Sequence, residues 1–349
     1  MIRQINNRPN PNEAFPNPNL PRLCFIKNVV KNPRIIIGDY TYWKGKGRTK
    51  DKTMIILSAE KIRTFAAFMK KTIIITGATS GIGLETTRLL AGKGYCILAV
   101  GHSTANCEKA DQDIRFSIPD ADITWFAGDL MQQREVVRVA SEIKKRLKEK
   151  SAESVYALIN NAGCARSRYM TTEDGYEQQF VLNHLAGFRL TYELLPYLLK
   201  EGGRVIMTSS ESHKNMKIRW NDVMMRKHYN PLLAYKQSKL CNMLFAQGLN
   251  DRYAAQGLHA YGVDPGLVNT DIGNKTTGIV DFVWKFRKRF GVHPSVPAQD
   301  YLYLCEQCEP PAGLYFHHGK AKKYNKQVTP ENATRLFELS EQLCDSRYE

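Results

Sequence analysis

The sequence lacks a long hydrophobic run. None of its apolar stretches approaches the roughly 18 residues that a membrane-spanning helix needs. Residues 6–21 are rich in Asn and Pro, where a secretory signal would carry its apolar core. A membrane-spanning or secreted protein is therefore not expected, and these absences favour a cytoplasmic location.

A disulfide framework is also missing. The eight cysteines are scattered, and they are Cys24, Cys96, Cys107, Cys164, Cys241, Cys305, Cys308 and Cys344. Several lie inside apolar runs, which favours reduced thiols. Cys305 and Cys308 form one CxxC pair, but the second ligand pair of a zinc site and the setting of a thioredoxin-like motif are absent. We therefore expect no metal site.

After residue 70 the chain has no basic stripe with interleaved aromatic residues. The net charge is +16 over 349 residues. Residues 1–70 hold 14 Lys and Arg against 4 Asp and Glu, whereas residues 71–349 hold 36 against 30. The basic excess thus belongs mostly to the first fifth of the chain, where it is typical of a solvated segment. No nucleic-acid partner is expected.

Residues 1–68 differ in character from the rest. Residues 22–43, which include Arg34-Ile-Ile-Ile-Gly-Asp-Tyr40, resemble the opening strands of hexapeptide-repeat xenobiotic acetyltransferases. The repeats of such a solenoid do not follow, and several coils are needed before one buries a core. We predict that 1–68 is an irregular, poorly ordered basic extension and that 69–349 is a separate domain. An acyltransferase activity of the extension is an alternative that the missing repeats disfavour.

From Met69 onward, short β-branched or apolar runs alternate with helix-like stretches. Strands are predicted at 71–76, 95–100, 123–127, 155–159, 204–208 and 258–263. Helices are predicted at 82–93, 132–149, 176–200 and 233–255, with a polar helical stretch after residue 100. This alternation is typical of βαβ units. The predicted fold class is α/β, a three-layer doubly wound parallel sheet with helices on both faces.

The first predicted strand runs into a glycine-rich turn, Thr76–Gly83 (TGATSGIG). Gly77, Gly81 and Gly83 remove side chains where the chain turns sharply, approaches a pyrophosphate and packs a helix against a strand. The next helix offers free N–H groups and the positive end of its dipole to phosphates. The turn predicts a dinucleotide site that also includes Thr79, Ser80 and Ile82.

The end of the second predicted strand lacks an acid. Residues 97–107 read ILAVGHSTANC, whereas an NAD site usually places Asp or Glu about 20 residues past the loop, bonded to the ribose 2′-hydroxyl. His102, Ser103 and Thr104 could hold a 2′-phosphate instead, with Lys109 assisting. NADP is therefore favoured, and NAD stays open because no Arg is present. The alternative is that these are plain loop residues.

Further motifs follow in a fixed order. They are Asp129-Leu130, Asn160-Asn-Ala-Gly163, Asn183 within VLNHL, Ser209-Ser210, Tyr235-Lys-Gln-Ser-Lys239 and Asp264–Thr270 (DPGLVNT). Together with the glycine-rich turn, they resemble the short-chain dehydrogenase/reductase superfamily over residues 71–349. The branch that contains retinol dehydrogenases and protochlorophyllide reductases is the most similar. The resemblance implies a Rossmann fold, a nicotinamide cofactor and interconversion of a carbonyl and an alcohol on a small molecule.

Tyr235 and Lys239 are four residues apart and would share one helix face. Hydride transfer to a carbonyl leaves charge on the substrate oxygen, and a tyrosine whose pKa is lowered by a nearby ammonium can supply the proton. The resemblance makes Tyr235 the general acid/base and Lys239 its pKa modulator and ribose ligand. It makes Ser210 the hydroxyl that orients the substrate oxygen, with Ser209 as second choice. Asn183 would hold a water that links Lys239 to solvent.

The resemblance also assigns cofactor contacts at other strand ends. Asp129 and Leu130 would frame the adenine, and Asn160 would fix the central strand. The residues expected near the nicotinamide half are Ala162, Gly163, Pro265, Gly266, Val268 and Thr270, the last two at its carboxamide.

Two stretches, 211–232 and 271–297, are expected beside the reacting centre. Their apolar residues are Met216, Ile218, Trp220, Met224, Met225, Tyr229, Val280, Phe282, Val283, Trp284, Phe286 and Phe290. They predict a pocket for a lipophilic carbonyl or alcohol, although packing of a capping helix explains them equally well. Residues 326–344 resemble the closing helix of the same branch.

Two broader questions stay open at this point. A non-catalytic, cofactor-sensing binding protein on the same fold is an alternative. In such a protein the catalytic residues would be expected to be replaced, and here they are all present. The superfamily resemblance leads us to expect a homodimer or homotetramer.

Overall fold

The structure is a computed structural model that describes residues 71–150, 154–269 and 291–348, and the backbone of 35–37 and 55–57. The chain divides into two units, Met1–Met69 and Lys70–Glu349. In the first unit, strands β1 (Ile35–Ile37) and β2 (Ile55–Leu57) pair in parallel. The rest of the acetyltransferase-like stretch 22–43 lies outside the described residues, so its interpretation stays a prediction.

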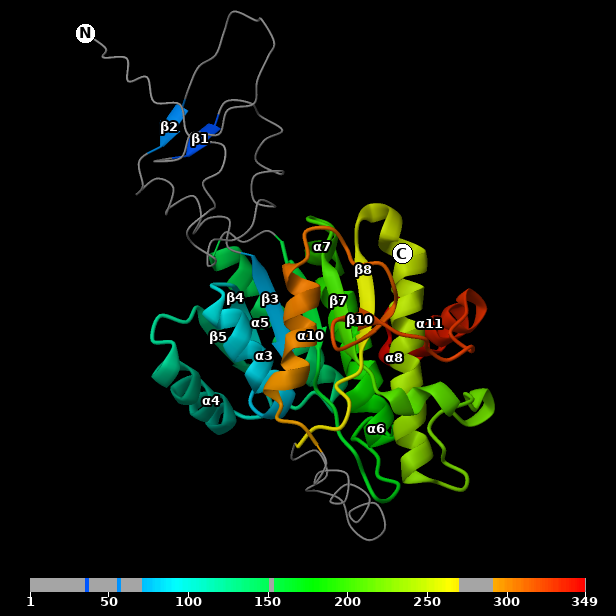
Figure 1. Cartoon of the computed structure of the whole chain (residues 1–349). Helices are drawn as coiled ribbons and strands as arrows, with labels where there is room; N and C mark the ends of the chain where they lie inside the picture. The colour runs from blue at the N-terminus through cyan, green and yellow to red at the C-terminus, as the bar shows by residue number, and fades with distance from the viewer. Residues whose placement is uncertain (1–34, 38–54, 58–70, 151–153, 270–290, 349) are drawn as a thin grey trace, which may run out of the picture. The chain divides into compact units, whose positions relative to one another are not determined.

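The second unit is built on a sheet with the strand order β10-β9-β8-β7-β6-β3-β4-β5 (Figure 1). Its strands are β3 (Thr72–Thr76), β4 (Cys96–Gly101), β5 (Ile123–Ala127), β6 (Ala157–Asn160), β7 (Arg204–Thr208), β8 (His259–Val263), β9 (Tyr315–His317) and β10 (Lys320–Ala321). All neighbours pair in parallel except β9 with β10. The six predicted strands are confirmed to within about two residues, whereas β9 and β10 were not predicted.

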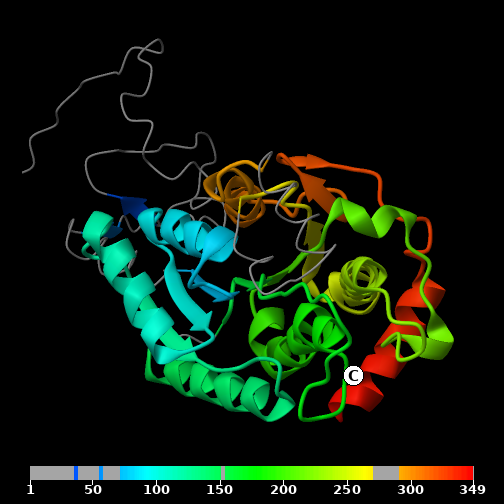
Figure 2. The ribbon, with the colours of Figure 1, turned by 90° about the horizontal axis from the view of Figure 1, so that it is seen from below.

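Helices cover both faces of the sheet (Figure 2). One face carries α3 (Gly81–Gly92), α4 (Thr104–Ser117) and α10 (Ser295–Glu306), and the other carries α5 (Gln133–Glu149), α7 (Ala186–Leu199) and α8 (Pro231–Tyr253). Helix α11 (Pro330–Cys344) packs on α8. The predicted three-layer α/β fold is confirmed. Among the helices of the described residues, none is both long and apolar enough to cross a membrane.

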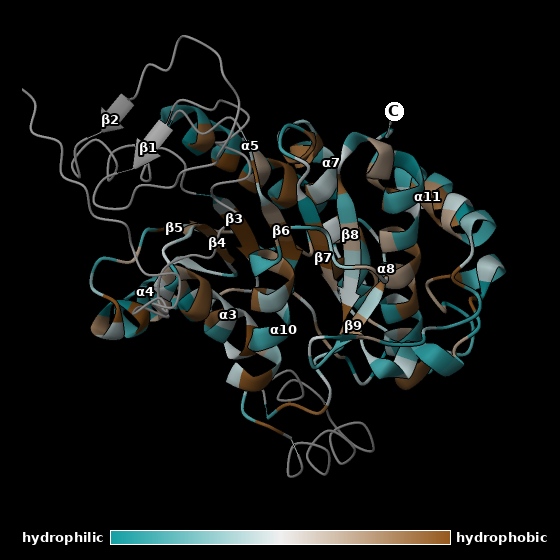
Figure 3. Ribbon diagram, turned by 45° about the horizontal axis from the view of Figure 1, so that its top comes forward, coloured by the Kyte–Doolittle hydropathy of each residue, from teal (hydrophilic) through white to brown (hydrophobic). Residues whose placement is uncertain are grey.

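The central strands β3, β4, β6 and β7 are buried along their whole length. Ile74 on β3 packs into the cluster formed with α5, α7 and α8, whereas Ile73 and Ile75 pack into the cluster formed with α3 and α10. Successive side chains of a strand point to opposite faces, so one apolar run supplies both clusters. Burying each isoleucine contributes roughly 1.5–3 kcal/mol. The central strands stand out as apolar in Figure 3.

The predicted helix 176–200 is interrupted. It begins as the short helix α6 (Gln178–Phe180), continues as the π-helical turn η1 (Val181–Leu185) and becomes α7. The Glu177 carboxylate accepts a hydrogen bond from the Phe180 N–H at 2.7 Å, which fixes the start of this segment. A π-helical turn inside a helix often marks a functional position, and this one contains Asn183.

Shorter 3-10 helices follow strand β7 and helix α8. They are η2 (Glu211–Asn215), η3 (Trp220–Asp222) and η4 (Ala254–Gln256). The first two lie in the stretch between β7 and α8, and η2 begins directly after Ser210.

The cysteines correct one expectation. Among the described residues, Cys96, Cys107, Cys164, Cys241, Cys305 and Cys344 are free and buried. Cys308 is disulfide-bonded, so the prediction of reduced thiols is wrong for this residue. Because Cys305 is free, the CxxC pair does not close on itself.

The sheet also fixes where a ligand can bind. Strand β3 lies between β4 and β6, so the chain leaves β3 toward one side of the sheet and later returns on its other side. In open α/β sheets, ligands bind outside the carboxyl ends of the strands at such a switch point. The expected site residues follow the carboxyl ends of β3, β4, β5, β6, β7 and β8.

Candidate active site

The glycine-rich turn between β3 and α3 has the geometry of a phosphate cradle. Gly77 and Gly81 adopt positive φ angles of 65° and 54°. A Cβ atom on Gly83 would lie 2.1 Å from the Gly77 carbonyl oxygen, so only glycine allows this packing of helix on turn. Ser80 caps α3 with its backbone alone, and the first turn of α3 contains no acid. The N-terminal N–H groups of α3 are thus suited to bind an anion.

A residue that the sequence analysis missed holds this turn in place. The Asn161 side-chain amide donates to the carbonyl oxygens of Thr76 at 3.1 Å and Gly77 at 3.3 Å. The Thr76 hydroxyl accepts the backbone N–H groups of Asn161 and Ala162, both at 3.0 Å. Asn161 therefore joins the end of β6 to the phosphate turn.

Asn160, which we expected to fix the central strand, contacts both strand β7 and the helical layer. Its side chain is 5% exposed and donates to the Thr191 hydroxyl at 3.2 Å and to the Met207 sulfur at 3.3 Å. Thr191 belongs to α7, so the amide points into the helical layer. The repeated asparagine in the NNAG motif was the available signal, but the sequence could not say which of the two faces the turn.

The end of β4 presents polar groups without an acid of its own. His102 is exposed, and its Nδ1 lies 3.6 Å from the Asp129 carboxylate. Ser103 caps α4 by accepting the Asn106 N–H at 3.4 Å, and the first turn of α4 contains no acid. Asp129 also accepts the Met131 N–H at 3.1 Å, while Leu130 is buried. The structure thus brings the ends of β4 and β5 together.

Helix α8 carries Tyr235 and Lys239 on one face. The Lys239 ammonium nitrogen lies 5.5 Å from the centre of the Tyr235 ring and donates to the Thr208 carbonyl oxygen at 3.0 Å. Lys239 is 2% exposed, and burial lowers its pKa from 10.5 to about 8. An ammonium has three donors, and Thr208 takes one of them. The tyrosine and the lysine are therefore close enough to interact electrostatically.

The two serines after β7 have different roles. Ser209 is fully buried, and its hydroxyl donates to the Lys239 carbonyl oxygen at 3.1 Å, which ties β7 to α8. Ser210 is half-buried, and its oxygen accepts both the N–H and the hydroxyl of Ser212, at 3.3 and 3.1 Å. A hydroxyl oxygen that already accepts retains its own hydrogen to donate, as binding a carbonyl oxygen requires.

Asn183 is anchored by protein groups. Its side-chain oxygen accepts the Cys164 N–H at 2.7 Å, and its amide donates to the Cys164 carbonyl at 3.1 Å and to the Ser238 hydroxyl at 2.9 Å. A Cβ atom on Gly163 would lie 2.9 Å from this side-chain oxygen and 3.5 Å from the Lys239 nitrogen. Gly163, Asn183 and Lys239 therefore meet at one point.

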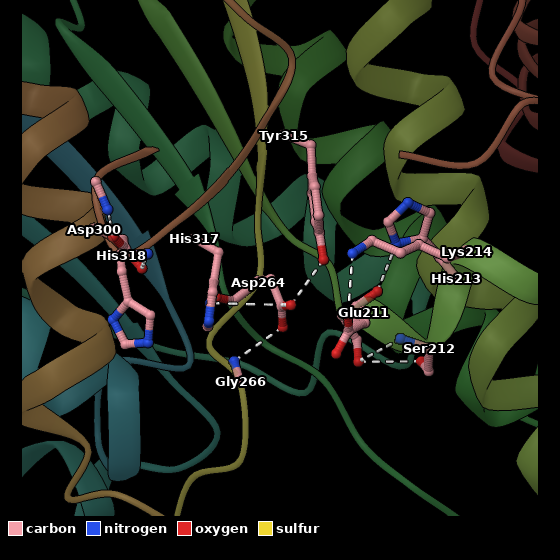
Figure 4. A network of polar contacts seen from close by, with 12 residues as sticks. Glu211, Ser212, His213, Lys214, Asp264, Gly266, Asp300, Tyr315, His317 and His318 are labelled. Atoms are coloured by element: carbon pink, nitrogen blue, oxygen red, sulfur yellow. Dashed lines mark hydrogen bonds and ion pairs between the residues drawn. The ribbon is translucent and has the colours of Figure 1, made fainter. Parts of the chain in front are cut away.

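The turn after β8 is held by a buried carboxylate (Figure 4). Asp264 is 4% exposed and accepts the Gly266 N–H at 2.9 Å and the Tyr315 hydroxyl at 2.8 Å. Gly266 has a φ of 70°, which allows the sharp turn. Val268 forms a parallel bridge with Val292. Thr270 lies outside the described residues.

The apolar residues of 211–232 are mostly core rather than pocket. Met216, Ile218, Met224 and Met225 are 0–8% exposed and belong to the cluster around α8. Trp220 and Tyr229 pack against the same cluster and are partly buried. Packing is thus the better interpretation of this stretch. The second apolar group, Val280 to Phe290, lies outside the described residues.

The comparison with known proteins agrees with this geometry. Residues 71–278 match the family model of the short chain dehydrogenases. The chain belongs to this family. Within it, the similarity to retinol dehydrogenases places the chain in the retinol dehydrogenase-like branch, as an oxidoreductase that acts on CH–OH groups of a small molecule.

Curated relatives cover most of the chain. It is 32% identical to retinol dehydrogenase 12 of Mus musculus over 310 residues, which span 85% of this chain and 96% of the relative. It is 33% identical to retinol dehydrogenase 13 of Homo sapiens over 287 residues, which span 78% of this chain and 84% of the relative. These identities place the chain beside enzymes named for an alcohol substrate.

Solved structures share the fold. A putative uncharacterized protein from Mycobacterium paratuberculosis is 29% identical, has a TM-score of 0.62, and the match covers 80% of this chain and 95% of the other. An alcohol dehydrogenase from Thermococcus sibiricus, complexed with 5-hydroxy-NADP, is 18% identical with a TM-score of 0.56 over 73% of this chain and 100% of the other. The glycine cradle, the open start of α3 and the buried Lys239 fit a nicotinamide dinucleotide.

Proposed function

We propose that this oxidoreductase uses NADP to interconvert a lipophilic carbonyl and its alcohol, with a retinoid-like substrate as the first candidate. The observation that carries the chemistry is the convergence of Lys239, Asn183 and Gly163 beside Tyr235 and the end of β7. The substrate class is supported by the retinol dehydrogenase relatives.

The preference for NADP rests on the end of β4. Residues 97–107 contain no acid that would repel a 2′-phosphate. His102 and Ser103 stand at the N-terminus of α4, whose first turn lacks an acid. The positive end of this helix dipole favours an anion at the same place.

In the direction of reduction, each residue has a separate task. The bound cofactor supplies the hydride. The Ser210 hydroxyl donates a hydrogen bond to the substrate oxygen and orients it. The Tyr235 hydroxyl gives its proton to that oxygen, and the Lys239 ammonium stabilises the tyrosinate that remains. In the direction of oxidation, Tyr235 takes the proton back.

The proton must then return from solvent. With a pKa lowered to about 8, Lys239 can release and regain a proton near neutral pH. Both amide hydrogens of Asn183 are taken by Cys164 and Ser238. A water at Asn183 would therefore have to donate to one of its carbonyl oxygens, and from there it could link Lys239 to solvent.

The function is tested by turnover of a substrate panel with NADPH and with NADH. The panel contains all-trans-retinal, a long-chain aliphatic aldehyde and a small water-soluble aldehyde, and the alcohol products are quantified by chromatography. We expect retinal or the long-chain aldehyde to exceed the small aldehyde in kcat/KM by roughly tenfold or more, and NADPH to exceed NADH. Absence of turnover with every pair would contradict the proposal and favour a non-catalytic binding protein.

A further inference from the structure

The backbone of Ser210 is held by a histidine that the catalytic scheme does not use. The His213 Nδ1 bonds to the Ser210 carbonyl oxygen at 2.6 Å, and the His213 backbone N–H donates to the same oxygen at 3.1 Å. His213 is fully buried. Two hydrogen bonds from one residue thus hold the Ser210 carbonyl oxygen.

The hydrogen bonds define the tautomer of the ring. His213 Nε2 accepts the Asn325 N–H at 3.3 Å, so the ring proton is on Nδ1, where it is donated to Ser210. The Asn325 side chain donates to the carbonyl oxygens of His213 at 2.6 Å and Met216 at 2.7 Å. Asn325 is 3% exposed. The segment after β10 therefore clamps the 3-10 turn that follows Ser210.

The His213 ring also packs against Tyr315 on β9, whose hydroxyl contacts the turn after β8 (Figure 4). The His213 ring meets the Tyr315 ring edge-on, with centres 4.8 Å apart and an interplanar angle of 74°. The Tyr315 hydroxyl donates to Asp264, which in turn accepts the Gly266 N–H. One buried network thus contacts both loops that are expected to flank the nicotinamide and the substrate oxygen.

We propose that His213 is a positioning residue that aims the Ser210 hydroxyl and couples it, through Tyr315 and Asp264, to the turn at Gly266. This inference rests on the proposed function. The His213 ring donates through Nδ1 and accepts through Nε2. A purely apolar ring would fill the same space without holding the Ser210 backbone.

The ring must stay neutral for this task. A proton on Nε2 would face the Asn325 N–H, so two donors would oppose each other. Glu211 and Lys214 from the same 3-10 turn, Asp264 at the end of β8 and Tyr315 on β9 are the ionisable groups around it. Burial outweighs the nearby carboxylates and lowers the pKa of His213 below its ordinary 6.5, which keeps the ring neutral at physiological pH.

The test compares His213→Leu with His213→Asn in the full-length protein. Leucine removes both polar contacts, whereas an asparagine amide can reproduce the Nδ1 donor. We expect His213→Leu to lower kcat about 10- to 100-fold, with the Kd for NADPH within about twofold of wild type. The kcat of His213→Asn should be at least about fivefold higher than that of His213→Leu. Tyr348→Phe, which removes a buried hydroxyl that donates to the Phe188 carbonyl oxygen, serves as the control for a stability loss alone.

A double-mutant cycle separates positioning from general destabilisation. If His213 acts through Ser210, then adding His213→Leu to the Ser210→Ala variant should lower kcat by less than about twofold. The inference would be overturned if His213→Leu lowered kcat equally in both backgrounds. It would also be overturned if His213→Leu lowered kcat no more than Tyr348→Phe does. Either result would leave the proposed function standing. An inactive wild type on the whole panel would overturn both. Thermal unfolding of each variant shows whether it is folded. If His213→Leu does not fold, the same comparison is made with His213→Asn.

Discussion

At the residue scale, neighbours of the same type have opposite environments. Ser209 is buried and bonds to the α8 backbone, whereas Ser210 is half-buried with a hydrogen left to donate. Asn160 points into a helical layer and Asn161 braces the phosphate turn. The sequence motifs contained both pairs, but Asn161 was given no role; for the serines, the prediction ranked Ser210 over Ser209, and Ser210 is the one with a hydrogen left to donate. For the asparagines, the choice depended on which face of β6 meets the turn, and only the sheet register decides that.

Ser103 allows a residue-scale test of cofactor preference. Asp and Asn both cap helices as well as Ser does, so the two substitutions differ only in charge. We expect Ser103→Asp to raise the KM for NADPH about tenfold or more, because a carboxylate would repel a 2′-phosphate. Ser103→Asn should stay within about twofold of wild type. Steady-state kinetics with NADPH and NADH check this. Equal KM values for NADPH in the two variants would show that the 2′-phosphate does not bind beside residue 103.

At the element scale, the strongly patterned elements were predictable. β3, β4, β7 and α5 have apolar runs or helical periodicity that is visible in the sequence. β9 and β10 are only three and two residues long, too short to show a period; β9 pairs with the edge of β8, and β10 pairs with β9. Sequence pattern alone also could not separate pocket from core in 211–232, because methionine suits both.

The stretch between β7 and α8 is tied to α6 by a buried carboxyl. The Tyr229 hydroxyl donates to Glu177 at 2.8 Å and accepts from Gln179 at 2.7 Å, and Glu177 is 1% exposed. This link holds Tyr229 against the start of α6.

Tyr229→Phe should therefore lower the free energy of unfolding by about 1–3 kcal/mol at neutral pH, because a buried acceptor loses its donor. Burial already raises the pKa of Glu177, and the loss of the Tyr229 hydrogen bond should raise it further. Since protonation relieves the unpaired charge, the difference from wild type should shrink as the pH falls toward 5. Urea unfolding at two pH values measures this. Tyr348→Phe is the control, because its acceptor is a carbonyl and its loss should not depend on pH.

At the scale of the whole molecule, two buried histidines link stability to pH. Burial lowers the pKa of His184 to about 3 and also lowers that of His213. The unfolded chain binds these protons near pH 6.5, and the native state binds them only at lower pH, so stability falls as the pH falls through that range. His184, with its pKa near 3, should remove about 1.4 kcal/mol between pH 7.5 and 5.5, and His213 acts in the same direction. Urea unfolding of wild type and His184→Gln should show a smaller loss in the variant, and identical slopes would contradict the assignment.

The bulk charge was a poor guide to function, because most of the basic excess lies in residues 1–70. Residues 70–349 form their own unit with both hydrophobic clusters. We expect deletion of residues 1–68 to leave kcat/KM within about threefold of the full chain. Loss of folding or of turnover in the truncated protein would show that the extension is part of the enzyme.

The central claim is that Tyr235, supported by Lys239, moves the proton of a carbonyl–alcohol reaction. The most direct test is Tyr235→Phe, assayed for single-turnover reduction of the best panel substrate and for NADPH binding by fluorescence. The account predicts that the rate falls by about 10²- to 10⁴-fold, while the Kd for NADPH changes less than about threefold. A variant that binds NADPH and reduces the substrate at the wild-type rate would contradict it.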